Sequence, residues 1–193
     1  RDLFHKAVSG LAEKCFVPLT VGGWVDSLDE FRKLTRLGAD KVCVNTEAFR
    51  RPELITECAE VFGNQCVVLS LDAKRDDDGV HRVMIDRGSE RTEAIPSQWA
   101  ARAVEAGAGE IFLNSVDHDG NRQGYDLPLM RSVVQAVSVP VIAMGGVRTW
   151  DHLVDGIREA GVDAVAAANI FHYTEHSTKK AKEYMRKAGI DVR

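Results

Sequence analysis

Short apolar runs alternate with amphipathic segments along most of the chain. The apolar runs are rich in β-branched residues, and Gly, Pro, Asn or Asp bounds each of them. Six strands are predicted, at residues 15–21, 41–45, 66–72, 110–116, 139–144 and 164–169. Strands that are apolar throughout are typical of a parallel sheet with helices packed against it.

The segments between these runs have the period of amphipathic helices. Helices are predicted at residues 27–37, 52–62, 96–106, 127–137, 149–160 and 178–188, and a further amphipathic pattern opens the chain. Ser27 and Glu30 have the spacing of a capping box, and Pro52 and Pro96 suit the first turn of a helix. Strands and helices therefore alternate regularly, as in a βα fold.

The chain contains an internal repeat. Residues 17–23 resemble residues 139–146, and both segments end in a Gly-Gly pair. Each is followed by a predicted helix and then by a Gly-x-Asp that opens the next strand, at Asp40 and Asp163. A repeated strand–turn–helix–strand unit favours a duplicated barrel over a doubly wound open sheet.

One segment departs from this alternation. Residues 74–95 contain Asp78-Gly79 followed by alternating apolar positions, which predicts a small hairpin. Insertions at the carboxyl end of a barrel strand lie at the catalytic mouth of such folds.

These patterns predict an α/β fold, a partial (βα)₈ TIM-barrel type in one domain over residues 1–193. A complete barrel has roughly 250 residues, whereas this sequence has 193 residues and about six predicted strands. We expect the first strand–helix–strand unit to be missing. Six strands would leave open sheet edges, which predicts a homo-oligomer that covers them.

The composition is that of an ordinary globular domain. The net charge of −4 gives no reason to expect nucleic acid or an anionic membrane as a partner. No apolar run reaches the ~20 residues of a membrane helix, and no signal-peptide pattern opens the chain. The four cysteines form no CxxC pair, which predicts reduced thiols in a cytoplasmic protein.

The functional residues of a βα-barrel lie where its strands end. Gly-Gly pairs follow two predicted strands, and small polar residues end two others. Such turns bind phosphate through backbone N–H groups, although a Gly-Gly pair also serves simply as a tight turn. Two repeat-related turns predict a substrate with a phosphate at each end. The candidate phosphate-binding residues are Gly23, Asn45 and Thr46 on one side and Gly145, Gly146, Ala168 and Asn169 on the other.

Carboxylates follow two further strands. Asp72 ends a fully apolar run, where a carboxylate is costly unless it is paired, hydrated or functional. We interpret it as a catalytic acid or base, with an ion pair to Lys74 or Arg75 as the alternative. Asp117 and Asp119 form a second acidic cluster, but the remainder of a Ca²⁺ loop is absent, so neither a metal site nor a cofactor is predicted.

Six blocks of sequence, in order, resemble one known family. The chain is similar over nearly its whole length to the cyclase subunit of imidazole glycerol phosphate synthase, from histidine biosynthesis. The blocks that carry this resemblance are residues 18–23, 38–46, 72–75, 107–111, 117–126 and 166–172.

The resemblance implies a fold, an activity and roles for particular residues. The family is a (βα)₈ barrel that closes an imidazole ring with ammonia from a glutaminase subunit and releases an aminoimidazole carboxamide ribotide. Asp72 matches one of its two catalytic aspartates. Asp119 and Gly120 join Gly145, Gly146 and Ala168 at one phosphate site, opposite Asn45 and Thr46. Lys41 and Glu110 match part of a charged ammonia gate, and Asp40 matches the glutaminase interface.

The sequence also departs from the family pattern at site positions. Trp24 stands where the family has the third glycine of a phosphate turn. Met144 and Asn169 replace small hydroxyl residues, and Asn114 replaces a threonine. The first-strand catalytic aspartate has no counterpart among these 193 residues. Such changes indicate altered or relaxed function.

Three hypotheses remain open from the sequence. The first is a family cyclase whose first strands are missing from this chain. The second is a divergent barrel that binds another phosphosugar. The third is a catalytically incompetent partial barrel that acts as an oligomeric or interaction module.

Overall fold

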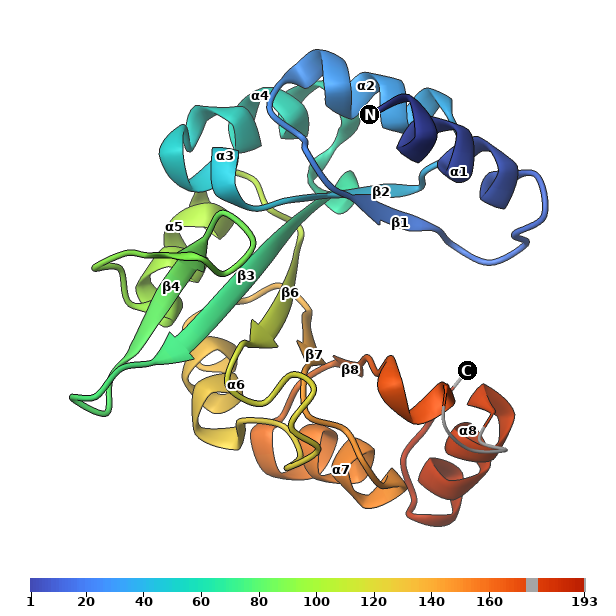
Figure 1. Ribbon diagram of the computed structural model, residues 1–193, viewed down its shortest axis with the longest axis vertical. Coiled ribbons are helices and arrows are strands. Elements are labelled where there is room, and N and C mark those ends of the chain that lie inside the picture. Colours follow the sequence, from blue (N-terminus) through green and yellow to red (C-terminus); the bar gives the residue numbers. More distant parts are fainter. Residues whose placement is uncertain (173–176, 193) are drawn as a thin grey trace.

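A curled, mainly parallel sheet forms the inner wall of a C-shaped molecule, and helices cover its outer side (Figure 1). The computed structural model describes residues 1–172 and 177–192. The parallel strands follow the order β1-β2-β3-β6-β7-β8. They are β1 (Thr20–Gly22), β2 (Lys41–Val44), β3 (Val67–Arg75), β6 (Glu110–Ser115), β7 (Val141–Met144) and β8 (Ala164–Val165). This arrangement is a half-barrel, and it confirms the predicted partial TIM-barrel type.

Helices connect these strands and form the outer layer. They are α1 (Asp2–Ala12), α2 (Leu28–Arg36), α3 (Thr46–Arg50), α4 (Glu53–Phe62), α5 (Pro96–Glu105), α6 (Leu127–Val134), α7 (Trp150–Asp155) and α8 (Thr178–Lys187). Shorter turns are η1 (Asn64–Cys66), η2 (Gly156–Ala160), which is a π-type turn, and η3 (Asn169–Phe171). In the described residues, no helix is both long enough and apolar enough to cross a membrane.

The two strands at the edges of the sheet are shorter than predicted. Strand β1 begins at Thr20 rather than at residue 15, because its partner β2 begins at Lys41 and those two residues pair. Phe16 is therefore 96% exposed in spite of its apolar neighbours. At the other edge, β8 ends at Val165 rather than at residue 169, and β7, against which it pairs, itself ends at Met144 before a Gly-Gly turn.

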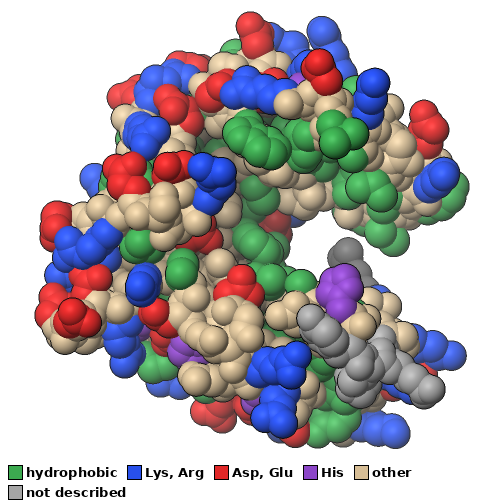
Figure 2. Space-filling view, in the orientation of Figure 1, with side chains coloured by type: hydrophobic (Ala, Val, Ile, Leu, Met, Phe, Trp, Pro, Cys, Tyr) green, Lys and Arg blue, Asp and Glu red, His purple; other side chains and the backbone are tan. Residues whose placement is uncertain are grey.

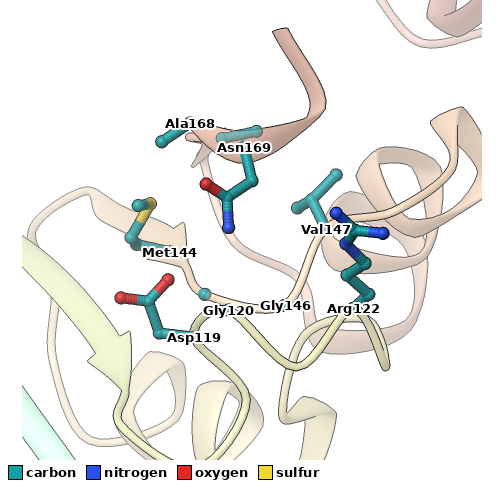
Figure 3. A pocket seen from close by; sticks show the side chains of 10 residues that line it. Asp119, Gly120, Arg122, Met144, Gly146, Val147, Ala168 and Asn169 are labelled. Carbon is teal, nitrogen blue, oxygen red and sulfur yellow. The ribbon is translucent and has the colours of Figure 1, made fainter. Parts of the chain in front are cut away.

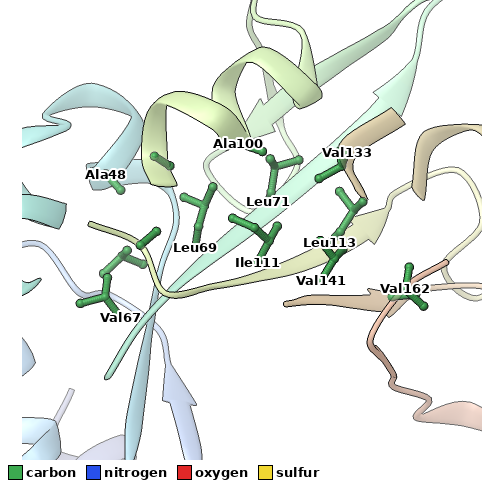
Figure 4. Close-up of a cluster of buried hydrophobic side chains, with 14 of the residues drawn as sticks. Ala48, Val67, Leu69, Leu71, Ala100, Ile111, Leu113, Val133, Val141 and Val162 are labelled. Carbon is green, nitrogen blue, oxygen red and sulfur yellow. The ribbon is translucent and has the colours of Figure 1, made fainter. Parts of the chain in front are cut away.

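The core lies between the convex face of the sheet and the helices. Alternate residues of β3 and β6 point outward, and Leu69, Leu71, Ile111 and Leu113 are almost completely buried there (Figure 4). Each such side chain contributes about 1.5–3 kcal/mol through removal of apolar surface from water. The intervening residues of the same strands face the concave side and are available to a site.

The predicted hairpin is confirmed. Strand β3 continues to Arg75 and pairs antiparallel with β4 (His81–Ile85), which pairs with β5 (Glu90–Arg91). The turn between β3 and β4 includes Gly79, whose N–H donates to the carbonyl of Asp76. The hairpin therefore projects from the carboxyl end of a central strand.

The internal repeat is confirmed by matching contacts. The Asp40 carboxylate accepts a hydrogen bond from the Leu19 amide at 2.7 Å. The Asp163 carboxylate accepts one from the Val141 amide at 2.9 Å. In each repeat, the aspartate that precedes one strand thus accepts a hydrogen bond from the beginning of the strand before it, and so links the two strands.

The predicted capping box at α2 forms only in part. The Ser27 hydroxyl accepts from the Glu30 amide at 3.3 Å, as predicted. The Glu30 carboxylate lies instead 2.5 Å from His5 Nε2 in a buried pair. Helix α1 packs over this position, so the carboxylate of the capping box joins two helices.

Candidate functional site

Two of the hollows at the carboxyl ends of the parallel strands contain residues predicted to form the site. The smaller lies at the ends of β6, β7 and β8 (Figure 3). Its lining residues are Asp119, Gly120, Arg122, Met144, Gly145, Gly146, Val147, Ala167, Ala168 and Asn169. The structure therefore brings together all six residues that the sequence assigned to this phosphate site, from three separate connections.

Backbone geometry requires glycine at both positions of the turn after β7. Gly145 and Gly146 have φ values of 100° and 89°, in the left-handed region. A Cβ at Gly146 would lie 2.1 Å from the carbonyl oxygen of Gly124, and a Cβ at Gly145 would lie 2.9 Å from that of Ser115. The pair thus serves as a tight turn beneath the loop that follows β6, whether or not it also binds an anion.

Arg122 lines the same hollow and was missed by the sequence reasoning. It follows Asp119 and Gly120 in the β6–α6 loop and has a left-handed φ of 60°. In Figure 3 its side chain rises beside Val147, while the amide of Asn169 points into the hollow. A basic residue two positions after an Asp-Gly turn is the signal that could have identified it.

The larger hollow is the concave face of the half-barrel, visible as the notch in Figure 2. Its lining residues are Arg1, Gly22, Gly23, Trp24, Val25, Asp26, Cys43, Asn45, Thr46, Glu47, Ser70, Asp72, Asp86, Arg87 and Phe112. The predicted residues Gly23, Asn45, Thr46 and Asp72 therefore lie together here. Asp86 and Arg87 come from the β4–β5 turn, which only the tertiary structure brings to the cleft.

Asp72 lies between two amide side chains. Asn45 Nδ2 donates to its Oδ2 at 2.8 Å, and Asn114 Nδ2 donates to its Oδ1 at 3.1 Å. Burial raises the pKa of Asp72 above its usual value, the two amide donors oppose this effect, and the charge of Asp119 adds to it. The sequence alternative of an ion pair with Lys74 or Arg75 is not seen among the described contacts.

The two other residues expected to bind phosphate near Asp72 already have protein partners. The Asn45 amide is hydrogen-bonded to Asp72, and the Thr46 hydroxyl accepts the Asp86 amide N–H at 2.9 Å. Asn114 keeps an unpaired acceptor, because its Oδ1 is buried without a hydrogen-bond partner in the described structure. That oxygen points toward Gly145, at the border of the two hollows.

Charged residues also meet at the opposite end of the concave face. Lys41 Nζ lies 2.9 Å from Glu110 Oε2, although the two residues are 69 positions apart in sequence. They begin β2 and β6, on either side of β3. The structure thus joins the two residues that the family resemblance assigned to the ammonia gate, while Asp40 lies exposed beside Lys41.

Asp126 holds the loop after β6 in place. Its carboxylate accepts from the Leu129 amide as the cap of α6, and it lies 2.8 Å from His81 Nε2 of the hairpin. Burial raises its pKa, but the hydrogen bonds from His81 and Leu129, with the positive charge of His81 and His118, outweigh burial and lower it. Among the described residues, no group of three or more His, Cys, Asp or Glu side chains could hold a metal ion.

The four cysteines are free thiols, three half-buried and Cys58 buried. Burial raises the pKa of Cys43 to about 12 and that of Cys58 to about 11. Thiols with such pKa values remain protonated near neutral pH, which suits packing rather than nucleophilic chemistry. Cys43 therefore contributes to the wall of the cleft.

A family model described as histidine biosynthesis protein matches residues 1–177. The chain belongs to this family. Membership confirms the relationship predicted from the six sequence blocks and supports a function of the cyclase or isomerase type in histidine biosynthesis. The matched region includes both hollows, the hairpin and all the candidate site residues.

Proposed function

We propose that the chain binds a phosphorylated sugar-type substrate across the mouth of the half-barrel and uses Asp72 for proton transfer in a ring-closing reaction of histidine biosynthesis. The observation that carries this proposal is the position of Asp72 between Asn45 and Asn114, because Asn114 also borders Gly145 of the smaller hollow. A proton-transfer group and a candidate anion site are thereby neighbours at one end of the sheet.

The environment of Asp72 supports acid/base chemistry. Its raised pKa brings protonation closer to neutral pH, where a group can both give and take a proton. The two amide donors fix the carboxylate in one orientation. Substrate binding would remove further water and raise the pKa more.

The composition of the smaller hollow supports phosphate binding there. Glycine turns allow close approach of an anion to backbone N–H groups. Arg122 adds a guanidinium, whose planar fork suits phosphate oxygens, and Asn169 adds an amide. Phosphate bound at this place would hold the rest of the substrate toward Asp72.

The position of the Lys41–Glu110 pair supports a proposed entrance for ammonia at the end of the half-barrel opposite the substrate site. The pair lies at the amino-terminal ends of β2 and β6, opposite Asp72 across the concave face. We propose that ammonia from a glutaminase subunit enters near this pair and that Asp40 contacts that subunit. The exposed position of Asp40 is compatible with such an interface.

The test is the variant Asp72→Asn, assayed by release of the aminoimidazole carboxamide ribotide with ammonium ion as nitrogen source. Loss of a general acid or base is expected to lower turnover by about 10²–10⁴-fold. Asp77→Asn removes the same charge from an exposed position in the hairpin turn and serves as the matched control. Retention of turnover by Asp72→Asn would contradict the role of Asp72. An inactive unsubstituted chain that still binds sugar phosphates would restrict the proposal to binding.

A second candidate function is that of an interaction module, supported by the distribution of exposed apolar residues. Of the eight large exposed hydrophobic side chains described, five lie within the first 24 residues, on α1 and around the free edge of β1: Leu3, Leu11, Phe16, Val17 and Trp24. Apolar surface and an unpaired strand edge together favour association. We propose that a second copy of the chain covers this region.

Light scattering coupled to size exclusion tests this second candidate. The unsubstituted chain is expected to elute as an oligomer, and Phe16→Ser is expected to shift it toward the monomer because Phe16 is almost fully exposed in the single chain. Val61→Ser, on α4, removes an exposed apolar side chain that lies outside the first 24 residues and is the control. A stable monomer at all concentrations would exclude the oligomer.

A further inference from the structure

Asn114 has one end of its amide paired and the other end buried without a partner. Its Nδ2 donates to Asp72 Oδ1 at 3.1 Å, whereas its own Oδ1 has no hydrogen-bond partner in the described structure. Asn45 donates to Asp72 Oδ2 at 2.8 Å, and its oxygen is not among the buried, unpaired atoms of the described residues. A buried acceptor that has lost water without gaining a donor is unfavourable. The two amides that hold Asp72 are therefore not equivalent.

The unpaired oxygen of Asn114 lies near a second oxygen. A Cβ at Gly145 would be 3.0 Å from Asn114 Oδ1 and 2.9 Å from the carbonyl oxygen of Ser115, so both oxygens border the same space. The strand register places Asn114 between Asp72 on β3 and Met144 on β7, and a thioether offers no hydrogen-bond donor. The amide thus satisfies the Asp72 carboxylate and leaves two acceptors together on its other side.

The protonation state of Asp72 decides which orientation of the Asn114 amide is favoured. An ionised carboxylate only accepts hydrogen bonds, so it requires Nδ2, and a hydrogen bond to a charged oxygen is strong enough to leave Oδ1 unpaired. A protonated Asp72 has an O–H to donate, which Oδ1 accepts after half a turn of the amide. That rotation exchanges nitrogen and oxygen with little change of shape, and it turns an N–H group toward the Ser115 carbonyl.

The groups that face Asp72 from other elements are acidic or uncharged at the closest positions. Burial raises the pKa of Asp72, the amides of Asn114 and Asn45 lower it, and the charge of Asp119 in the loop after β6 raises it. Met84, which pairs with Asp72 from β4, is uncharged. The charged residues that line the same hollow are Arg1, Asp26, Glu47, Asp86 and Arg87. Asn114 is the neighbour on the side of the smaller hollow that gains a partner when Asp72 takes up a proton.

We propose that Asn114 is a positioning residue whose amide turns with the proton on Asp72. It donates to the carboxylate before proton transfer and accepts from the carboxylic acid afterwards. The inference rests on the acid/base role proposed for Asp72. In that role, Asp72 takes a proton from the substrate, the electron pair of the broken bond stays on the substrate atom, and Asn114 holds the acid in place until the proton is returned.

The first test is an NMR titration of the unliganded chain, with ¹³C in the side-chain carbonyl and carboxyl carbons of Asn and Asp. Asp72→Asn identifies the Asp72 signal, and Asn114→Leu identifies that of Asn114. As Asp72 is protonated, the Asn114 carbonyl carbon is expected to move downfield with the same midpoint, because its oxygen becomes a hydrogen-bond acceptor. An Asn114 signal that does not follow the titration of Asp72 would overturn the inference.

Asn45→Leu and Asn114→Leu form a matched pair, because each removes one amide donor to Asp72. Loss of a donor to the carboxylate raises its pKa. Asn114 also accepts from the protonated form, so its loss disfavours both forms and changes the pKa less. The rise in the pKa of Asp72 should be about twice as large in Asn45→Leu as in Asn114→Leu. An equal rise, or a larger one in Asn114→Leu, would show two fixed donors and overturn the inference.

Turnover connects the amide rotation to the reaction. A threonine hydroxyl both donates and accepts, so Asn114→Thr should keep kcat within about threefold, whereas Asn114→Leu should lower kcat about tenfold and change KM less than about twofold. Equal losses of kcat in the two variants would indicate a packing role and contradict the inference. The two proposals fail separately. If the NMR titration gives the expected result but Asp72→Asn retains turnover, the acid/base role of Asp72 is wrong and the amide rotation stands.

Discussion

Two turns with the same sequence origin have different surroundings in this molecule. Gly22-Gly23-Trp24 follows β1, and Gly145-Gly146-Val147 follows β7, at corresponding positions of the repeat. Val147 is 7% exposed, whereas Trp24 is 61% exposed. A Cβ at Gly146 would meet the Gly124 carbonyl at 2.1 Å, whereas one at Gly23 would meet only the ring of Phe4, at 3.6 Å.

The difference arises from the position of each strand in the sheet. Strand β7 lies between β6 and β8, so the long loop after β6 folds over its turn, where the Gly124 amide donates to the Gly146 carbonyl at 2.8 Å. Strand β1 is at the edge and has β2 as its strand neighbour in the described chain. A Gly-Gly motif therefore allows the backbone to form a turn that could bind an anion, but the neighbouring loops determine which ligand can reach that turn.

The largest expected effect is a difference in the free energy of unfolding between alanine substitutions in the two Gly-Gly turns. Gly146→Ala introduces a clash with the Gly124 carbonyl and strain at a φ of 89°, and should lower the free energy of unfolding by about 3 kcal/mol or more. Gly23→Ala meets no close atom, so only strain at a φ of 134° remains, about 1–2 kcal/mol. Urea unfolding measures both. Equal losses in the two variants would show that the loop after β6 does not crowd the second turn.

An intermediate effect on stability is expected at Asp126, which holds the loop after β6 in place. Asp126→Asn keeps a good helix cap but removes the charge beside His81, and should cost about 1–2 kcal/mol at pH 7. The folded pKa of Asp126 is lowered relative to its unfolded value near 4. Its contribution is therefore fully present above about pH 4 and is lost as the pH falls through the lower folded pKa. Urea titrations from pH 7 to pH 2 should show the difference between the two proteins shrinking in acid, and a constant difference would contradict this assignment.

The smallest effect compares the two aspartates of the repeat. Asp163→Ala and Asp40→Ala each remove a carboxylate that accepts an amide hydrogen bond at the start of a strand. The Asp163 bond is partly buried and that of Asp40 is exposed, so we expect losses of about 1–2 and about 0.5–1 kcal/mol, respectively. Thermal unfolding measures both. A larger loss for Asp40→Ala would contradict the view that the β1 edge is the more weakly held half of the repeat.

Much of the fold was predictable because its signals are local. The apolar runs at β2, β3, β6 and β7, the caps at Ser27 and the hairpin after Asp72 are all read from neighbouring residues. The ends of β1 and β8 were wrong because a strand requires a partner, and the length of the partner is set elsewhere in the chain. The role of Glu30 was incomplete for the same reason, since His5 is 25 residues away.

The candidate site divides in a similar way. Sequence alone found Asp72, the glycine pairs and the Lys41 and Glu110 positions, because strand ends and family blocks are visible along the chain. It missed Arg122 and Arg87, whose loops approach the hollows only through tertiary packing.

The sequence by itself determined a βα half-barrel of the histidine biosynthesis family, since hydrophobic period and motif order are properties of the linear chain. Tertiary structure alone decided that Asn45 and Thr46 are occupied by protein partners, that Asp72 lies between two amides, and that Trp24 projects into an acidic cleft. The physical reason is that hydrogen-bond partners and local charge depend on groups far apart in sequence, which only the packing of the strands brings within a few ångströms.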